Sequence, residues 1–442
     1  MEIGDKLILD IIDINTEGRG VAKKDRLIFF VEGAILNERL EAKIVGKKKN
    51  FYQAKKIKTV EKSPYLEDAR CPYADICDGC NFQNIEYERQ EKYKKDLVIA
   101  TINKIAREDL EDIDFIGAEN RYGYRNKLEL KVDYRGQISY FSRSSNSHIA
   151  IDKCIIADDK INDLLVIVQD AIREYGLRGY DNKKDLGLIK NIIVRATSLG
   201  ESMLVFVMSQ EGFKDKDNFY DYINKKAEVT SIYQTVNNRK NNYKIGKKLE
   251  LISGKDKISE KIKDRYFYLS PRSFFQVNTK MTEKLYRRAF DYVKETNPIN
   301  VIDLYSGTGT TSILLAKEVE KIDSVEIVAD AVKDARRNAK INSIDNINWI
   351  NDAAENVIGD LNINDRRSTV LFDPPRKGLD PKIIDVLGES SIDSIVYISC
   401  NPATLARDIY DLKGHGFKLD KITGVDMFVN TLHVETVVLM TR

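Results

Sequence analysis

Residues 271–442 alternate apolar, strand-like segments with helical segments, and this alternation constrains the fold more than any other feature of the chain. The strand-like segments are NVIDLY, DSVEIV, TVLFDP and SIVYISC, separated by TTSILLAKEV, AVKDARRNAKIN and PKIIDVLG. A regular alternation of this kind predicts a doubly wound, parallel α/β sheet. Such sheets bind ligands at the carboxyl ends of their strands. Polar residues at those ends are therefore the first candidates for a functional site.

A glycine-rich turn, DLYSGTGT, follows the first of these strands and opens a helical segment. Gly307 and Gly309 let a ligand approach the backbone, but a dinucleotide fingerprint needs a third glycine where Ser312 stands. Glu326 ends the next strand, where a carboxylate can accept hydrogen bonds from both hydroxyls of a ribose. The pattern favours a nucleoside cofactor that has no pyrophosphate. The alternative is an ordinary tight turn in an α/β protein.

The segment FDPPR, residues 372–376, ends a later strand. Two consecutive prolines remove two backbone donors and make a rigid loop, of the kind that can hold a nucleobase. Enzymes that methylate exocyclic amines usually have an aromatic residue after the prolines, whereas Arg376 stands here. The loop therefore argues against an exocyclic amine as the methyl acceptor. A simple strand-to-loop stop is the alternative interpretation.

Cys400 ends the strand-like segment SIVYISC. Carbon 5 of uracil is a poor nucleophile, and a thiolate that adds to carbon 6 converts the ring into an enolate that is nucleophilic at carbon 5. This chemistry requires a pocket-facing cysteine of lowered pKa and a base that later removes the proton from carbon 5. Glu435, which interrupts the apolar segment LHVETVV, is the candidate base. A strand-end cysteine can also be a small buried hydrophobic residue.

Three cysteines lie close together in CPYADICDGC, with the spacing C-x5-C-x2-C. They are Cys71, Cys77 and Cys80, and Cys154 is the remaining cysteine once Cys400 is set aside. Four thiolates suit either zinc or an iron–sulfur cluster, and chemistry alone favours zinc. A disulfide framework is not expected in a chain of this composition and length.

The first 270 residues have a different character. Residues 1–60 contain short apolar segments (LILDIID, RLIFFVEGA, RLEAKIV and FYQAKKIKTV) separated by turn signals, which predicts a small OB-type barrel. Apolar residues at helical spacing predict a helix from about residue 85 to 106. NKLELKVDY, QISYFS, KNIIVRAT and ESMLVFVMS read as strands, and KINDLLVIVQDAIREYG reads as a helix. This region is therefore predicted to be α+β.

Composition excludes several classes of protein. The 71 basic and 69 acidic residues give a net charge of +2, which excludes a uniformly basic nucleic-acid coat but allows local patches. One patch is formed by Lys43, Lys47, Lys48, Lys49, Lys55, Lys56 and Lys58. Phe51 and Tyr52 lie within it, and a solvated edge strand is the simpler interpretation. Neither a membrane-spanning apolar run nor a secretory signal is present, so we expect a cytoplasmic protein.

Taken in order along the chain, these motifs resemble the RNA 5-methyluridine methyltransferases, and most closely the branch that acts on 23S ribosomal RNA. EGRGVAKKDRLIFFVEGAILNERLEAKIV resembles the N-terminal TRAM domain of that family, and RYGYRNKLEL resembles a central segment that faces RNA. CPYADICDGCNFQ together with Cys154 is similar to a four-cysteine [4Fe–4S] site, which changes the expected metal from zinc to iron–sulfur. SFFQVN, DLYSGTGT, FDPPRKGLD, ISCNPATLARD and DMFVNTLHVETVV complete the family's order.

The resemblance implies a role for each matching residue. Cys400 is expected to be the nucleophile and Glu435 the base. The residues expected around S-adenosylmethionine are Gln276, Tyr305, Glu326 and Asp373, with Asp352 at the adenine. The chain departs from the family's usual pattern at four positions: Ser306, Asp78, Val429 and Asn430. The last two replace a Pro-His pair and alter the segment that leads to Glu435.

We therefore predict three domains: a TRAM barrel over residues 1–60, a cluster-bearing central region over 61–270 and a Rossmann-like methyltransferase domain over 271–442. The predicted reaction is methylation of a uridine in 23S ribosomal RNA by a monomeric enzyme. The alternatives are a transfer RNA uracil methyltransferase, a cytosine methyltransferase and a non-catalytic RNA-binding iron–sulfur protein. Cytosine enzymes that act on RNA usually have two cysteines in the pocket, and Cys400 is the one available here.

Overall fold

The computed structural model describes residues 1–15, 18–142, 147–240 and 244–442. Residues 16–17 lie outside this description, and residue 17 is the first of the segment that resembles a TRAM domain. The chain divides into two compact units. One comprises Met1–Leu97 with Asn430–His433, and the other comprises Val98–Val429 with Val434–Arg442. A short piece from near the carboxyl end thus belongs to the N-terminal unit.

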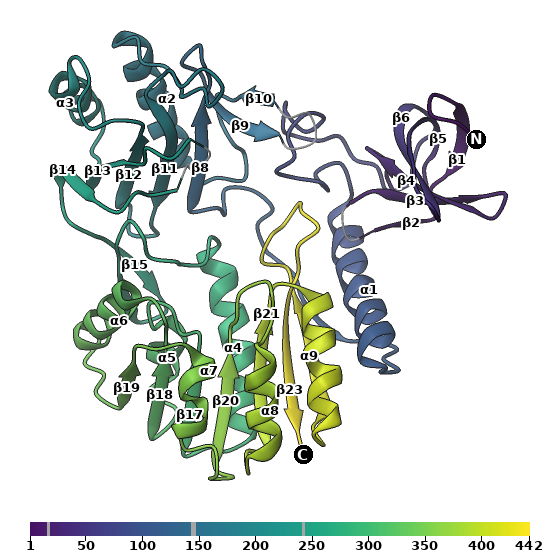
Figure 1. Ribbon diagram of the computed structural model, residues 1–442, viewed down its shortest axis with the longest axis vertical. Helices are drawn as coiled ribbons and strands as arrows, with labels where there is room; N and C mark the ends of the chain where they lie inside the picture. Colours follow the sequence, from purple (N-terminus) through teal and green to yellow (C-terminus); the bar gives the residue numbers. More distant parts are fainter. Residues whose placement is uncertain (16–17, 143–146, 241–243) are drawn as a thin grey trace. The chain divides into compact units, whose positions relative to one another are not determined.

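The N-terminal unit contains a six-stranded sheet in the order β1-β5-β6-β4-β3-β2 (Figure 1). β4 and β6 are parallel, and the other neighbouring strands are antiparallel. In β5, Leu40, Ala42 and Ile44 are buried at alternate positions, as one-sided burial requires. The strands are Lys6–Asp10 (β1), Asp13–Ile14 (β2), Gly20–Lys24 (β3), Leu27–Glu32 (β4), Arg39–Lys47 (β5) and Phe51–Glu61 (β6).

The four strands expected in this region are confirmed by β1, β4, β5 and β6, whereas the sequence did not indicate β3. The OB-type assignment of the sheet stays a prediction. The expected helix is confirmed as α1, Tyr87–Ala106. Within the unit, the Gln90 amide donates to the carbonyls of Phe82 (2.9 Å) and Ile85 (2.8 Å), and its oxygen accepts from the Asn430 amide (3.0 Å). Gln90 therefore fastens Asn430–His433 within this unit.

The second unit begins with a central seven-stranded sheet in the order β10-β9-β8-β11-β12-β13-β14. β11 and β12 are buried along their whole length, and the pair β12–β13 is parallel while the other neighbours are antiparallel. The strands are Lys127–Val132 (β8), Ile138–Ser142 (β9), Ser147–Ala150 (β10), Ile189–Ala196 (β11), Ser202–Met208 (β12), Ser231–Val236 (β13) and Leu249–Gly254 (β14). Two helices accompany them: Asp159–Glu174 (α2) and Lys216–Lys226 (α3). The predicted α+β content is confirmed.

A hairpin connects this central part to the rest of the second unit. β15 (Ile258–Ile262) pairs with β16 (Arg265–Leu269). Its apolar side chains share one hydrophobic cluster with the central sheet and with helices further along the chain. The two parts therefore share a core, and this explains why they form one compact unit. The three-domain division stays a prediction.

The remaining strands form an eight-stranded sheet in the order β19-β18-β17-β20-β21-β23-β22-β7 (Figure 1). β19, β18, β17, β20 and β21 are parallel, as predicted. β23, which follows the predicted strands along the chain, runs antiparallel to both β21 and β22. The strands are Asp114–Ile116 (β7), Asn300–Leu304 (β17), Lys321–Val325 (β18), Ile347–Ile350 (β19), Ser368–Phe372 (β20), Ser394–Ser399 (β21), Lys418–Val425 (β22) and Glu435–Thr441 (β23).

Apolar side chains leave this sheet on both faces and pack against helices. One buried cluster joins the sheet to α8, α9 and the end of α1, and another joins it to α4. Leu371 and Phe372, adjacent in β20, enter different clusters, as the alternation of side chains in a strand requires. The helices are Thr279–Glu295 (α4), Thr310–Leu315 (α5), Ala329–Ile341 (α6), Ala354–Val357 (α7), Pro381–Glu389 (α8) and Pro402–Gly414 (α9). In the described ranges, no helix is long and apolar enough to cross a bilayer.

Candidate active site

The carboxyl ends of four parallel strands bring the predicted site residues to one edge of the sheet. Leu304 at the end of β17 is in register with Val325 of β18 and with Phe372 of β20. Tyr305, Glu326 and Asp373 are the residues that follow these three positions. The register therefore places three predicted cofactor residues side by side, although they are distant in sequence.

The glycine-rich turn connects β17 to α5. Gly307 and Gly309 have positive φ angles of 57° and 77°, and Tyr305 has a φ of 68°. A Cβ atom at Gly309 would lie 2.5 Å from the Trp349 ring, so the close approach of Trp349 requires glycine here. For a bulky residue such as Tyr305, a left-handed conformation costs about 1–3 kcal/mol and is concentrated at functional sites. No sequence motif predicts this strain.

Glu326 lies against the glycine-rich turn. One carboxylate oxygen accepts a hydrogen bond from the backbone amide of Gly307 (3.0 Å), and the other accepts from that of Val328 (2.7 Å). These two bonds fix the carboxylate at the strand end. A ribose diol placed beside the turn would meet its remaining lone pairs, since each carboxylate oxygen can accept more than one hydrogen bond.

Behind the turn, buried carboxyl groups lie close to one another. Asp303 is buried within β17 and accepts hydrogen bonds from Thr311 (2.6 Å) and Ser312, yet its second oxygen is buried with no hydrogen-bond partner. Burial raises the pKa of Asp303 to about 6. Burial, followed by the nearby charge of Asp303, raises the pKa of Asp373 to about 7. A site that lacks a compensating cation for such groups is suited to a positively charged ligand.

Tyr286 and Gln276 complete this part of the site. Tyr286 projects from α4, is buried, and forms hydrogen bonds with Asp373 and with the side chain of Gln276. Gln276 is also buried, and its backbone carbonyl accepts a hydrogen bond from Asn126 (3.0 Å). The structure therefore brings Gln276 to Asp373 through Tyr286. Sequence reasoning missed Tyr286, because α4 itself was not predicted.

Cys400 and Glu435 lie next to each other across an antiparallel pair. Ser399 of β21 is in register with Thr436 of β23. Cys400 follows Ser399 and Glu435 precedes Thr436, so these two residues come one step further along the same antiparallel pair. Residues directly opposite in antiparallel strands point to the same face. The structure thus brings together the predicted nucleophile and the predicted base. Because β23 reverses direction, its first residue arrives at the same edge as the last residues of the parallel strands.

The electrostatic environment of Cys400 differs from the expected one. Burial, and then the charges of Glu435 and Asp373, raise the pKa of the thiol to about 11, although Arg376 lowers it by its charge and by a hydrogen bond. Burial, and then Asp373, also raise the pKa of Glu435 well above its usual range. The expectation of a lowered thiol pKa was therefore wrong for the ligand-free protein, because desolvation and two acidic neighbours outweigh one arginine.

The remaining predicted residues lie apart from this group. Asp352 is exposed after β19 and accepts hydrogen bonds from the Ala353 amide (2.7 Å) and from Asn356 (2.9 Å). These two bonds hold its carboxylate, which lowers its pKa. Its strand is the outermost in the parallel series, so Asp352 stands beyond Glu326 along the same edge.

The four predicted cluster ligands are distributed over both units. Cys71, Cys77 and Cys80 belong to the N-terminal unit and Cys154 to the second. All are partly exposed, and no disulfide joins the cysteines of the described chain. Within the ranges that the structure describes, no group of three or more His, Cys, Asp or Glu side chains is arranged to hold a metal ion. The iron–sulfur site stays a prediction from the donor residues alone.

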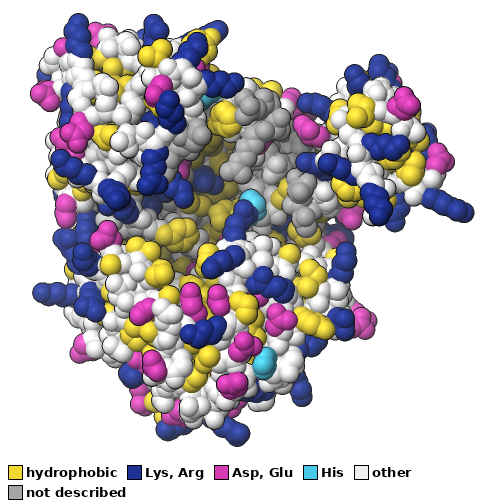
Figure 2. All heavy atoms as spheres, viewed as in Figure 1, with side chains coloured by type: hydrophobic (Ala, Val, Ile, Leu, Met, Phe, Trp, Pro, Cys, Tyr) yellow, Lys and Arg dark blue, Asp and Glu magenta, His cyan; other side chains and the backbone are white. Residues whose placement is uncertain are grey.

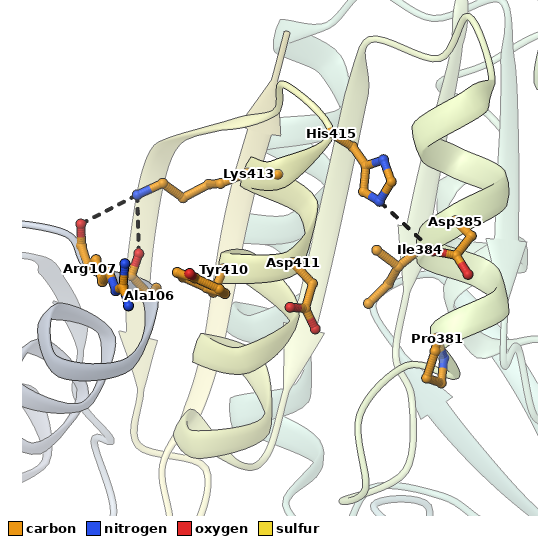
Figure 3. A pocket seen from close by; sticks show the side chains of 10 residues that line it. Ala106, Arg107, Pro381, Ile384, Asp385, Tyr410, Asp411, Lys413 and His415 are labelled. Atoms are coloured by element: carbon orange, nitrogen blue, oxygen red, sulfur yellow. Dashed lines mark hydrogen bonds and ion pairs between the residues drawn. The ribbon is translucent and has the colours of Figure 1, made fainter.

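A cavity of about 510 Å³ lies between α8 and α9 near the end of α1, away from the predicted residues (Figure 3). Lys413 crosses it and donates to the carbonyl of Ala106 (3.1 Å), which closes the carboxyl end of α1. His415 faces Asp385 across it at 3.9 Å. The lining carries both signs of charge.

The fold and the site define a class: a Rossmann-like enzyme with a nucleoside-cofactor edge, a rigid Asp-Pro-Pro loop and a cysteine opposed by a buried acid. The family described as tRNA (Uracil-5-)-methyltransferase matches residues 86–442. The chain belongs to this family and is an RNA (uracil-5-)-methyltransferase. Its family's reaction is the S-adenosylmethionine-dependent methylation of uracil carbon 5 in RNA.

Individual relatives support the assignment along the whole chain. An uncharacterized RNA methyltransferase of Clostridium tetani is 35% identical over 439 residues, which is 98% of this chain and 95% of the relative. Another, from Caldanaerobacter subterraneus, is also 35% identical and covers 100% of this chain and 99% of its own. The crystal structure of Pyrococcus abyssi tRNA (uracil-54, C5)-methyltransferase with S-adenosyl-L-homocysteine is similar, with a TM-score of 0.81 and 25% identity. It covers 98% of this chain and 100% of its own.

Proposed function

We propose that this enzyme methylates carbon 5 of a uridine in 23S ribosomal RNA through a covalent bond between Cys400 and carbon 6 of the uracil. The observation that carries the proposal is the placement of Cys400 and Glu435 one residue beyond the registered pair Ser399–Thr436, at the edge where the strand ends also gather Tyr305, Glu326 and Asp373. A nucleophile and a base at the carboxyl edge of a cofactor-binding sheet is the arrangement that this reaction requires.

The residues of the edge fit the proposed methyl donor. S-adenosylmethionine, when bound, supplies a methyl group on a positively charged sulfonium. We assign Glu326 to its ribose hydroxyls, Asp352 to its adenine, and Gln276, Tyr305 and Asp373 to the remainder. The observation behind this fit is chemical: Asp303 leaves a buried oxygen without a partner, and the pKa of Asp373 is raised to about 7. A cationic ligand relieves both conditions.

The chain's own residues then perform the steps on the uracil. The Cys400 thiolate adds to carbon 6, and the electron pair displaced from the double bond makes carbon 5 nucleophilic. After carbon 5 has gained the methyl group, the Glu435 carboxylate removes the proton from carbon 5. The double bond re-forms and the thiolate leaves carbon 6. Arg376, which hydrogen-bonds to Cys400, stabilises the thiolate both before addition and on departure.

The raised pKa of Cys400 makes ionisation part of the reaction. With its pKa raised to about 11, the thiol is mostly protonated at neutral pH in the ligand-free protein. Two of the groups that raise this pKa, Glu435 and Asp373, are carboxyls whose own pKa values are raised. We infer that occupation of the site by the cationic donor favours the thiolate.

For the RNA, two observations point in different directions. The predicted TRAM region and cluster cysteines resemble the ribosomal RNA branch, whereas the matching family and the Pyrococcus abyssi structure carry transfer RNA in their descriptions. The structural match extends over 98% of this chain, so the N-terminal sheet by itself does not separate the two substrates. Transfer RNA is therefore the second candidate. Lys and Arg side chains on the visible surface of the N-terminal unit suit the phosphates of either RNA (Figure 2).

One experiment tests the chemistry and another tests the substrate. RNA that contains 5-fluorouridine at the target cannot lose a proton from carbon 5, so the enzyme should remain bound to it covalently through the peptide that contains Cys400. Mass spectrometry of the trapped peptide reads this directly. Mapping of 5-methyluridine in ribosomal and transfer RNA from cells with and without the gene identifies the substrate. If 5-methyluridine is lost from transfer RNA alone, transfer RNA and not ribosomal RNA is the substrate.

We also propose that Cys71, Cys77, Cys80 and Cys154 hold a [4Fe–4S] cluster. The support is the donor set: four thiolates in the family's spacing, with none needed for the proposed reaction. Protein purified without oxygen should contain about four iron and four sulfide per chain, and single Cys→Ser changes should reduce both. Stoichiometric zinc without acid-labile sulfide would contradict the proposal.

A further inference from the structure

Cys400 and Arg376 approach the same point from two different segments of the second unit. Cys400 directly precedes Asn401, the residue that caps the amino end of α9. Arg376 lies in the loop of residues 373–379, which follows β20. Part of this loop is a turn closed by a hydrogen bond from the Gly378 amide to the Pro375 carbonyl (2.9 Å). What holds this loop in place therefore decides where Arg376 stands relative to the thiol.

The first two turns of α9 hold the loop through its backbone. Asn401 and Thr404 both donate to the carbonyl of Arg376, at 3.1 and 3.2 Å. Arg407 donates to the carbonyl of Lys377 at 3.0 Å. The helix that begins after the nucleophile thus fixes the backbone of the residue that contacts the nucleophile.

Asp408 anchors the far end of the loop. Its carboxylate is completely buried, and one oxygen accepts hydrogen bonds from the backbone amide of Leu379 (2.9 Å) and from the hydroxyl of Tyr397 (2.7 Å). The other oxygen accepts from Nε of Arg407 (2.9 Å) and from a second guanidinium nitrogen (2.6 Å). An ionised carboxylate with four donors is a strong anchor, and a buried one is costly to disturb.

The loop packs closely against α9 at Gly378. Gly378 has a φ of 79°, and a Cβ atom there would lie 2.5 Å from Asp408 and 2.7 Å from Arg407. The loop therefore comes as close to the Arg407–Asp408 pair as a backbone can. Because the nucleophile directly precedes the cap of the same helix, the loop and the nucleophile share one rigid support.

We propose that Arg407 and Asp408 are positioning residues that clamp the loop of residues 373–379 so that Arg376 is held against the Cys400 thiol. The inference rests on the proposed role of Cys400 as nucleophile. Neither residue of the pair touches the reacting atoms. They act through the loop backbone and hence through Arg376. Groups whose charges act on the thiol are Glu435, Arg376 and Asp373, and Arg376 is the cation among them.

The test measures the thiol itself, without RNA or methyl donor. The rate at which iodoacetamide alkylates Cys400 follows the thiolate fraction, so its pH profile reports the pKa of the thiol. Quantifying the Cys400 peptide by mass spectrometry separates it from the other four cysteines. Arg376→Gln should slow alkylation at a fixed pH by about 10-fold, which corresponds to one pKa unit. Asp408→Asn should slow it by about 3- to 10-fold through the same arginine.

A double variant and a matched control make the result specific. Asp408→Asn combined with Arg376→Gln should be no slower than Arg376→Gln alone, because the clamp acts only through that side chain. Asp411→Asn removes the same charge from the exposed side of α9, and the alkylation profile should match the wild type. If Asp408→Asn does not fold, Thr404→Val, which removes one hydrogen bond to the Arg376 carbonyl, should give a smaller shift in the same direction.

Two outcomes would overturn the clamp. One is a folded Asp408→Asn protein with a lower melting temperature but an unchanged Cys400 profile, which would make the pair merely structural. The other is full additivity of the two changes. An active Cys400→Ala enzyme would refute the proposed nucleophile without altering either alkylation result, so the two failures can be told apart.

Discussion

The N-terminal sheet and the eight-stranded sheet both bury carboxyl groups, but they treat them differently. In the N-terminal sheet, Glu38 is buried and accepts hydrogen bonds from Thr59 (2.5 Å), from the backbone amide of Ile35 (3.1 Å) and from the ammonium group of Lys56. At the edge of the eight-stranded sheet, burial and then the charge of Asp303 raise the pKa of Asp373, and burial and then the charge of Asp373 raise that of Glu435, against the opposing effect of Arg376.

The difference distinguishes a carboxylate that stabilises the fold from the carboxyl groups proposed to act on the ligands. A buried charge with a cation and donors around it stabilises the fold that surrounds it, and removing it leaves those donors unsatisfied. Buried acids without enough compensation are strained in the ligand-free state and depend on a ligand to relieve them. The comparison therefore predicts opposite responses to substitution at the two places.

The largest effect is expected at the nucleophile. Cys400→Ala should have no measurable turnover, because carbon 5 cannot be activated without addition to carbon 6. Binding of RNA and S-adenosylmethionine should persist, since neither is assigned to the thiol. Methyl transfer from labelled donor gives the first reading, and filter binding gives the second. Turnover by the Cys400→Ala enzyme would show that the group of residues around Cys400 does not act through this nucleophile.

The next effect is expected at the base. Glu435→Gln should permit addition and methyl transfer but slow the loss of the carbon 5 proton by about 100- to 10,000-fold. A denaturing gel with methyl-labelled donor should then show a labelled protein–RNA complex. Normal turnover without that band would show that another group accepts the proton. Asp420→Asn, on the exposed part of β22, is a matched control and should behave as the wild type.

At the structural carboxylate, the effect should be on folding. Glu38→Gln should lower the free energy of unfolding of the N-terminal sheet by about 1–3 kcal/mol, because Lys56 and Thr59 lose the buried carboxylate that accepts their hydrogen bonds. Glu435→Gln should leave the stability unchanged or raise it. Thermal unfolding of the two variants decides the point. A stable Glu38→Gln protein and a destabilised Glu435→Gln protein would contradict this prediction.

The pH dependence of stability should follow from the raised pKa of Asp373. A carboxyl whose pKa is higher in the folded than in the unfolded protein binds its proton more tightly when folded. Its stabilising contribution is complete below its unfolded pKa of 3.8 and is lost as the pH rises through about 7. Asp373→Asn should therefore gain melting temperature relative to the wild type as the pH rises from about 5 to about 8. A constant difference would contradict the raised pKa.

The smallest effect is expected on the surface of the N-terminal sheet. Lys49→Ala should reduce the slope of log affinity for RNA against log salt by about 0.7, the contribution of one contact to a single strand. The rate of methyl transfer at saturating RNA should not change. Lys418→Ala, an exposed lysine of β22, is the matched control and should leave the slope unaltered. If both variants have the same slope of log affinity against log salt, the lysine patch does not contact RNA.

The glycine-rich turn shows which features of the site can be predicted from local sequence. Glu326 was identifiable because a glycine-rich turn and the end of the following strand are both written in short segments, whereas Tyr305 was expected from the family resemblance. The positive φ of Tyr305 could not be predicted, because the residue type does not indicate strain that the surrounding turn imposes. Tyr286 was missed for a different reason. Its helix lies outside the alternating motifs, and its role depends on contacts with Asp373 and Gln276 that only folding creates.

By itself, the sequence indicated the α/β class of the catalytic fold and the candidate residues at the strand ends, Cys400 and Glu435 among them. These follow from hydrophobic periodicity and from residue types at strand ends, which are local properties. Tertiary structure alone decided that β23 runs antiparallel, which sets Glu435 opposite Cys400. It also decided that the thiol is less acidic than the chemistry first suggested. Strand direction and pKa depend on what packs around a residue, and neighbours that are distant in sequence meet only in the folded chain.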